Sequence, residues 1–160
     1  MFLKVVGKKS GAILGESSDL KHKDEIELID WSWGLSTPGS MESGATGRRQ
    51  LKEFVFSKRA DRSSTPLMVV ATRNEALSEV VLSVRKAGGV ALPYWVLKLT
   101  DARVTKFDVE SSIDSDGAPI LRERIALSFK AINIEFTVQN AKGAAISSSE
   151  FNDDVSMGAS

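Results

Sequence analysis

The chain has 160 residues, of which 42% are hydrophobic and 26% charged, and its formal net charge at pH 7 is zero. These values are typical of a single globular domain that buries about two-thirds of its unfolded surface. The charge balance argues against a dedicated nucleic-acid binder, which usually carries an excess of Lys and Arg. The sequence has no cysteine and one histidine, which excludes disulfides, thiolate nucleophiles and nitrogen- or sulfur-rich metal sites within one chain.

The first residues, MFLKVVGKKSGAILG, interrupt each apolar pair with Lys or Gly. They lack the apolar run of roughly 7–15 residues that a secretory signal peptide needs. Nowhere does the sequence reach the roughly 18 consecutive apolar residues of a membrane helix. We therefore expect a protein that starts in the cytoplasm, with a first short strand from Phe2 to Val6.

The segment from Gly15 to Gly34, GESSDLKHKDEIELIDWSWG, begins as a polar loop and becomes a strand. In the triplet Trp31-Ser32-Trp33, a pleated strand places both indoles on one face and the serine on the other. Burial of two indoles would remove roughly 300–500 Å² from water, so Trp31 and Trp33 are predicted to anchor the core. The apolar phase slips between Leu28 and Ile29, which indicates either a β-bulge or a strand that changes sheets.

The next segment, Leu35–Gln50 (LSTPGSMESGATGRRQ), is rich in Gly and Ser and too long for a hairpin turn. Such a loop in a compact domain is either disordered or engaged with something outside the domain.

The rest of the chain predicts further strands, one helix and a turn. Thr65 as N-cap with Pro66 at the first helical position predicts a helix of about two turns, ending at Arg73-Asn74. The turn is expected at Asp114–Gly117. The strands are expected at Leu51–Lys58, Val80–Val84, Tyr94–Asp108, where one long strand bends, and Arg122–Val138, which contains a second phase slip.

These elements predict a mainly β protein: a single antiparallel β-barrel of two rolled sheets with one short flanking α-helix. The barrel domain is expected to span residues 1–138. Residues 139–160, which are small and polar, are expected to form a mobile tail.

Catalytic patterns are missing from the sequence. His22 lies between Lys21 and Lys23, where a solvated side chain is expected rather than a catalytic base. Asp114–Gly117 lacks the further ligands of a calcium loop, and Glu25, Glu27 and Asp30 suit a solvated strand face better than a carboxylate pair. The residues therefore predict no catalytic site, no metal and no cofactor, and they favour binding or assembly.

Five blocks carry a resemblance to a known family: the Gly15–Gly34 segment, FVFSKRADRSSTPLM, VVLSVRKAGG, LTDARVTKFDVESS and LSFKAINIEF. In this order they resemble the haemolysin-coregulated protein (Hcp) family, the tube subunit of the bacterial type VI secretion system. The resemblance extends to about Phe136. ALPYWVLKL (Ala91–Leu99) is more apolar than expected there, and the segment from Thr137 onward finds no clear counterpart.

The resemblance implies a two-sheet β-barrel with one helix that forms hexameric rings. It also implies that the rings stack into a tube inside a contractile sheath, with a spike at the tip and small effector proteins in the lumen. No enzymatic activity is expected, and export would proceed without a cleaved signal peptide. Ser32 is expected to face the lumen and effectors, with a satisfied surface serine as the alternative. The long loop is expected to contact neighbouring subunits, with Arg48 and Arg49 pairing across the seam; the loop residues named for this role are Thr37, Met41, Arg48 and Arg49.

Two other functions stay open at this point. One is a free-standing barrel that binds a carbohydrate or nucleic acid through exposed aromatic side chains. The other is a hydrolase that uses acidic residues such as Glu25 or Glu27.

Overall fold

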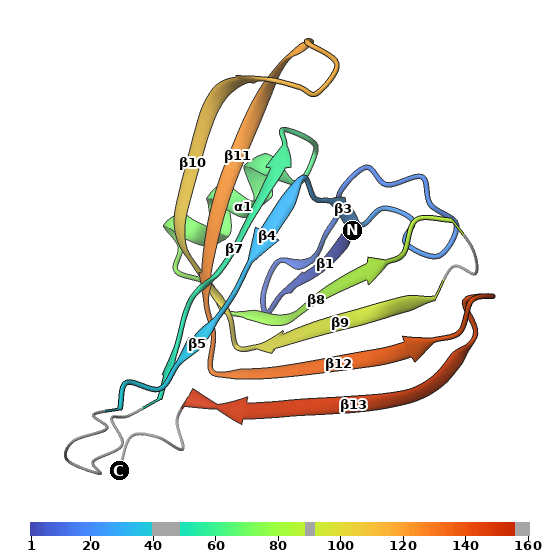
Figure 1. Ribbon diagram of the computed structural model, residues 1–160. Coiled ribbons are helices and arrows are strands. Elements are labelled where there is room, and N and C mark those ends of the chain that lie inside the picture. Colours follow the sequence, from blue (N-terminus) through green and yellow to red (C-terminus); the bar gives the residue numbers. More distant parts are fainter. Residues whose placement is uncertain (40–48, 89–91, 156–160) are drawn as a thin grey trace.

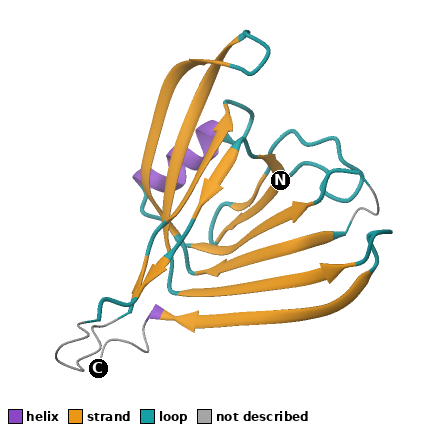
Figure 2. Cartoon of the chain, viewed as in Figure 1, coloured by secondary structure: helices purple, strands orange, loops and turns teal. Residues whose placement is uncertain are grey.

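The computed structural model describes residues 1–39, 49–88 and 92–155 (Figure 1). Strands make up most of the described chain, and one short helix packs against them (Figure 2). Two main antiparallel sheets enclose one hydrophobic core, as the sequence predicts for a mainly β protein of two rolled sheets. The two sheets do not join into one closed hydrogen-bonded cylinder among the described residues.

The larger sheet has seven strands. Its order is β13-β12-β9-β8-β1-β2, and β3 also pairs with β1. The strands are β1 (Phe2–Gly7), β2 (Gly11–Ile13), β3 (Ile26–Glu27), β8 (Leu77–Arg85), β9 (Pro93–Thr100), β12 (Ala131–Gln139) and β13 (Ala145–Asp154).

The smaller sheet has four strands in the order β10-β11-β7-β4. A separate two-stranded ribbon, β5-β6, lies at the base of the long Gly- and Ser-rich loop. These strands are β4 (Asp30–Ser32), β5 (Leu35–Ser36), β6 (Gln50–Leu51), β7 (Phe54–Arg59), β10 (Arg103–Ile113) and β11 (Pro119–Ser128).

The first phase slip marks a crossing between the two sheets. The N–H of Leu28 donates to the carbonyl of Met1, beside the seven-stranded sheet, and the N–H of Ile29 donates to Ser57 of the four-stranded sheet. Consecutive residues thus bond to different sheets. Of the two explanations for the slip, the change of sheet is correct.

Two further crossings follow the same principle. The long strand expected over Tyr94–Asp108 is two strands, β9 and β10, which lie in different sheets. Asp101 between them adopts a positive φ of 50°, which turns the chain sharply. The second phase slip lies between β11 and β12, which also belong to different sheets.

The core lies between the two sheets and the helix α1 (Ser64–Thr72). Phe54 and Phe56 of β7 have no exposed surface and are the largest apolar side chains in it. From α1, Leu67 and Val70 join the same cluster. The helix is short enough that it depends on this packing for its stability.

The helix begins earlier than the sequence predicts. Ser63 is the N-cap, so Pro66 is the third helical residue rather than the first. Proline is tolerated there because the N–H groups of the first turn have no partner within the helix. At the other end, Asn74 has a φ of 49°, as expected for the residue that terminates the helix.

The expected mobile tail after Gln139 is corrected by the structure over residues 145–154. This segment is β13, which pairs along its length with β12. The sequence AISSSEFNDD looks like a tail because β13 is the outermost strand and its side chains are mostly exposed. Its order comes from backbone hydrogen bonds, which side-chain polarity does not reveal.

Candidate assembly surfaces

One apolar surface lies where the β10–β11 hairpin extends beyond the core (Figure 1). On β11, Ile125 is completely buried, whereas Leu121 on the same strand face is 56% exposed. On β10, Val109 is 47% and Ile113 is 73% exposed. The register places Val109 opposite Glu123, on the face that Leu121 and Ile125 share. We call Val109, Ile113 and Leu121 the hairpin overhang.

A second apolar surface lies near the end of β12. Ile132 and Ile134 are buried, and the next two residues on that face, Phe136 and Val138, are 40% and 41% exposed. The ring of Phe136 meets Tyr94 of β9 edge to face, with centroids 6.4 Å apart. We call Phe136 and Val138 the β12 overhang. It belongs to the other sheet, so the two overhangs lie on different sides of the molecule (Figure 1).

Exposed apolar side chains that gather in this way mark interaction surfaces more often than isolated ones do. Neither overhang was singled out from the sequence. Ile113 lies directly before the Asp114–Gly117 turn, and Leu121 shortly after it. Apolar residues flanking the turn of a long hairpin are a signal that this hairpin reaches past the core.

The tryptophans lie at the margin of the core rather than at its centre. Trp31 is half-buried, and its ring centroid is 6.1 Å from those of Phe54 and Trp95. Trp33 follows the end of β4, and its ring centroid lies 6.2 Å from that of Phe151 of β13. The physical reason is that β4 is an edge strand of three residues, so only β7 pairs beside Trp31, and Trp33 lies beyond the end of the strand.

Ser32 is exposed and lies on the opposite face of β4 from Trp31. Its register partner is Val55 of β7, and Asp30 on the same face pairs with Arg122 at 2.5 Å. Ser32 therefore lies on this face between the Asp30–Arg122 pair and the apolar side chain of Val55.

The loop residues expected at subunit contacts have different outcomes. Met41 and Arg48 lie outside the described residues, and Thr37 is exposed. Arg49 makes two hydrogen bonds of 2.6 Å to the carboxylate of Asp153 on β13 of its own chain. Its guanidinium holds the pKa of the Asp153 carboxyl below the usual range, chiefly through the side-chain hydrogen bond.

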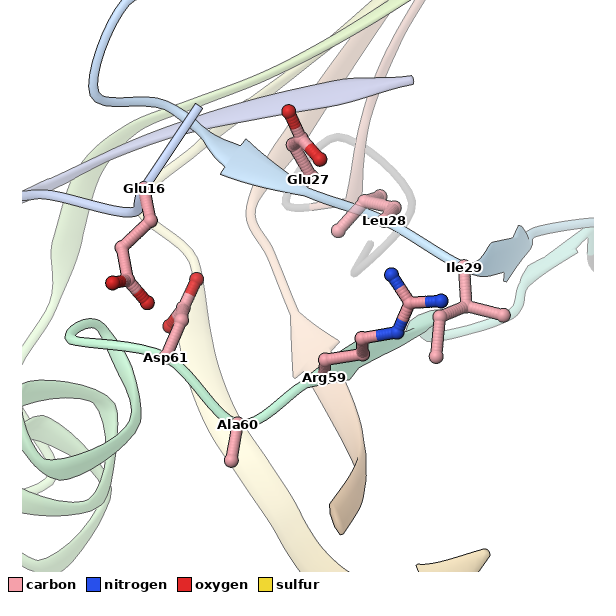
Figure 3. A pocket seen from close by; sticks show the side chains of 7 residues that line it. All are labelled: Glu16, Glu27, Leu28, Ile29, Arg59, Ala60 and Asp61. Atoms are coloured by element: carbon pink, nitrogen blue, oxygen red, sulfur yellow. The ribbon is translucent and has the colours of Figure 1, made fainter. Parts of the chain in front are cut away.

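A small hollow of about 220 Å³ lies between the loop before β3 and the end of β7 (Figure 3). We call it the acidic hollow, because three of its lining residues are carboxylates and one is a cation. Glu16 accepts a hydrogen bond from the backbone of Arg62 at 3.2 Å. Arg59 is already paired with Asp114. The lining residues are Glu16, Glu27, Leu28, Ile29, Arg59, Ala60 and Asp61.

His22 is not a solvated side chain, contrary to the expectation. Its ring stacks on Phe2 with centroids 4.6 Å apart, and its Nδ1 lies 2.8 Å from Glu25. The loop folds back on β1, and the polar sequence around His22 gives no sign of this. No nucleophile is hydrogen-bonded to His22 among the described residues. Glu25 is thus engaged with the imidazole, and Glu27 lies apart from it at the acidic hollow.

Within residues 1–39, 49–88 and 92–155, no group of three or more His, Cys, Asp or Glu side chains is arranged to hold a metal ion. In the same part of the chain, no helix has the length and apolar character needed to cross a membrane.

The fold therefore defines the class: an antiparallel two-sheet β protein with one helix docked on its core. Solved structures of this class include a type VI secretion system effector from Yersinia pestis. That protein is 26% identical, with a TM-score of 0.73 and coverage of 96% of this chain and 98% of that one. Hcp1 from Salmonella typhimurium is 28% identical, with a TM-score of 0.74 and coverage of 98% and 95%.

Sequence comparison agrees with the structural comparison. The chain is 32% identical over 148 residues to Protein hcp1 of Pseudomonas aeruginosa, covering 90% of this chain and 86% of that protein. The family model described as "Type VI secretion system effector, Hcp" matches residues 2–136. The chain belongs to the Hcp family of the type VI secretion system, the family whose resemblance the sequence blocks indicate.

Proposed function

We propose that this chain is the subunit of the inner tube of a type VI secretion system. In this proposal it closes into hexameric rings, and the rings stack into a tube that is ejected together with a spike protein by a contractile sheath. Small effector proteins travel in the lumen. The role is structural rather than enzymatic, and the chain leaves the cytoplasm without a cleaved signal peptide.

The observation that carries this proposal is the pair of apolar overhangs on different sheets. Ring closure needs a heterologous interface, in which each subunit offers one surface to one neighbour and a different surface to the other. The hairpin overhang and the β12 overhang are two such unlike surfaces. Burying them between copies would remove exposed Leu, Ile, Val and Phe side chains from water.

The test is to make the hairpin overhang polar. Ile113→Gln with Leu121→Gln should shift the native mass from a ring to smaller species, because it removes the apolar contact between subunits. Both side chains lie outside the core, so the subunit itself should stay folded. The matched control is Glu110→Gln with Arg124→Gln, two exposed positions on the opposite face of the same hairpin. Annular particles at unchanged concentration in the Ile113/Leu121 variant would contradict this assignment.

For cargo, we propose that Ser32 faces the lumen. Its support is its exposure on the face of the four-stranded sheet opposite the one where Trp31 packs. Ser32→Gln should reduce the amount of effector that co-purifies with the ring, while the native mass of the ring stays unchanged. Normal effector loading by this variant would remove Ser32 from the proposal.

For stacking, we propose that the loop bearing Thr37, Met41, Arg48 and Arg49 contacts the adjacent ring. The Arg49–Asp153 pair ties the end of this loop to β13 of the same chain, so Arg49 acts as its anchor. Deletion of residues 37–47 should leave rings intact and shorten or abolish tubes. Tubes of normal length after this deletion would contradict the role of the loop.

A further inference from the structure

A cationic hollow of about 540 Å³ lies where three elements meet: the turn between β1 and β2, the end of α1 and the start of β10. It is lined by Lys8, Lys9, Arg73 and Arg103, all of them exposed, and by a single carboxylate, Glu75. No ion pair involves any of these four cations in the described part of the chain.

Glu75 offsets only one of these four positive charges, and its carboxylate is held against the turn. Its oxygens accept hydrogen bonds from the backbone N–H groups of Ser10 at 2.7 Å and Lys9 at 2.8 Å, and from the Ser10 hydroxyl at 2.7 Å. These bonds, those from Ser10 above all, hold the pKa of Glu75 below its usual range. The four cations are exposed, and one guanidinium N–H of Arg103 donates to the backbone carbonyl of Asn74.

The acidic hollow of Figure 3 carries the opposite charge. Glu27 lines it, is exposed and forms no ion pair among the described residues. Asp61, which also lines it, shares the ammonium of Lys58 with Glu123, at 2.8 Å and 2.6 Å respectively. One ammonium against two carboxylates leaves a net negative charge beneath the hollow.

The two hollows lie at opposite ends of α1. Asp61 of the acidic hollow precedes the helix, and Arg73 of the cationic hollow follows it directly. Nine helical residues span about 14 Å, so the lysines of one subunit do not reach its own acidic hollow. The helix dipole accounts for an acid before α1 and a cation after it. It does not account for Lys8 or Glu27, which come from other elements.

We propose that the cationic hollow of one copy of this chain docks at the acidic hollow of the next copy, with Lys8 and Lys9 of the β1–β2 turn facing Glu16 and Glu27. The inference rests on the proposed ring and adds a charged contact to its apolar surfaces. Because the hollows are unlike, the contact is head-to-tail, as ring closure requires. The acidic hollow, at about 220 Å³, has room for an ammonium group, since one water takes roughly 30 Å³.

The experiment is a charge swap read by native mass at low and high salt. Lys8→Glu and Glu27→Lys should each raise the concentration needed for half-assembly by about tenfold at low salt, because like charges then face each other. The double variant, Lys8→Glu with Glu27→Lys, should recover most of this loss. Controls are Lys142→Glu and Glu135→Lys, the same substitutions at exposed positions outside both hollows.

Two results would overturn the inference: single variants that assemble like the unaltered chain, or single variants whose loss the swap does not recover. Lys8→Gln and Glu27→Gln provide milder variants if circular dichroism shows that a reversed charge prevents folding. If Lys8→Glu instead reduced binding to added DNA and left assembly unchanged, the cationic hollow would serve a different partner. An unaltered chain that stays monomeric would overturn the proposed function itself, which is distinguishable from failure of the swap alone.

Discussion

The ammonium of Lys58 lies 2.6 Å from a carboxylate oxygen of Glu123, and the two side chains are 0% and 2% exposed. They face each other across neighbouring strands, since Lys58 of β7 is the register partner of Glu123 of β11. The same ammonium also contacts Asp61 at 2.8 Å and the hydroxyl of Ser64 at 3.1 Å. One buried lysine thus links the four-stranded sheet to the beginning of α1.

Breaking this pair from one side should be strongly destabilising. Glu123→Leu leaves the buried ammonium without its sheet partner and should lower the free energy of unfolding by about 3–5 kcal/mol. The paired replacement, Lys58→Met with Glu123→Leu, removes both charges and should recover most of that loss. Urea unfolding followed by circular dichroism measures both. A double variant as unstable as Glu123→Leu alone would contradict the explanation that the loss comes from an unpaired buried charge.

The Arg49–Asp153 pair predicts a pH dependence at the base of the long loop. Because Arg49 lowers the pKa of Asp153 in the folded chain, the folded state binds fewer protons at this group than the unfolded chain does. The stabilisation is therefore present above the unfolded pKa of about 3.9 and is lost as the pH falls through the folded pKa.

Carboxyl NMR titration of Asp153 measures this directly. In the unaltered chain the midpoint should lie below the ordinary value for Asp, and in Arg49→Ala it should return towards that value. Hydrogen exchange of β5 and β6 should also become faster in Arg49→Ala. Lys52→Ala, an exposed cation near the same ribbon, should change neither readout. An unchanged Asp153 midpoint in Arg49→Ala would contradict the pairing.

Gly15 is required by close packing of backbone on backbone. A Cβ at this position would lie 2.5 Å from the carbonyl oxygen of Glu25 and 2.6 Å from the Cα of Ile26. Neither atom can rotate away, so Gly15→Ala should cost about 1–3 kcal/mol in thermal or urea unfolding. Gly39→Ala is the matched control, because nothing lies within 4 Å of the added methyl group there. Equal stability of the two variants would contradict this close approach.

Removal of β13 tests whether the last strand belongs to the domain. A chain ending at Gln139 exposes the backbone edge of β12, together with Ile132 and Ile134 on the face that Phe151 now borders. Unpaired edges of this kind favour association between chains. We expect a lower melting temperature and aggregation, measured by light scattering during heating. A soluble truncated chain with unchanged melting would restore the interpretation of this segment as a dispensable tail.

Much of the fold was predictable because alternation along strands is a local property. The first strand, the helix, the Asp114–Gly117 turn and the two phase slips all came from residue order alone. The slip at Leu28-Ile29 showed that something changes there, but both a bulge and a change of sheet reverse the phase of a strand. Only the hydrogen bonds of these two residues to different sheets distinguish the two explanations.

The exposed residues were less predictable, because exposure depends on where a strand lies in its sheet. Trp31 was expected to anchor the core; it packs against the core from β4, an edge strand that leaves its indole half-covered. Ile113 and Leu121 are apolar residues that would be expected in a core. They are exposed because their hairpin extends beyond the core. β13 has little apolar content and is ordered by backbone pairing.

By itself, the sequence determined the β class, the presence of a short helix and the family, since these follow from the order and spacing of residues along the chain. The tertiary structure alone decided which carboxylates meet which cations, because the partners are far apart in sequence. Strand register joins Lys58 to Glu123, and the end of the long loop brings Arg49 against Asp153 of β13. It likewise decided that the acidic and cationic hollows lie at opposite ends of α1, because each collects side chains from several separate elements.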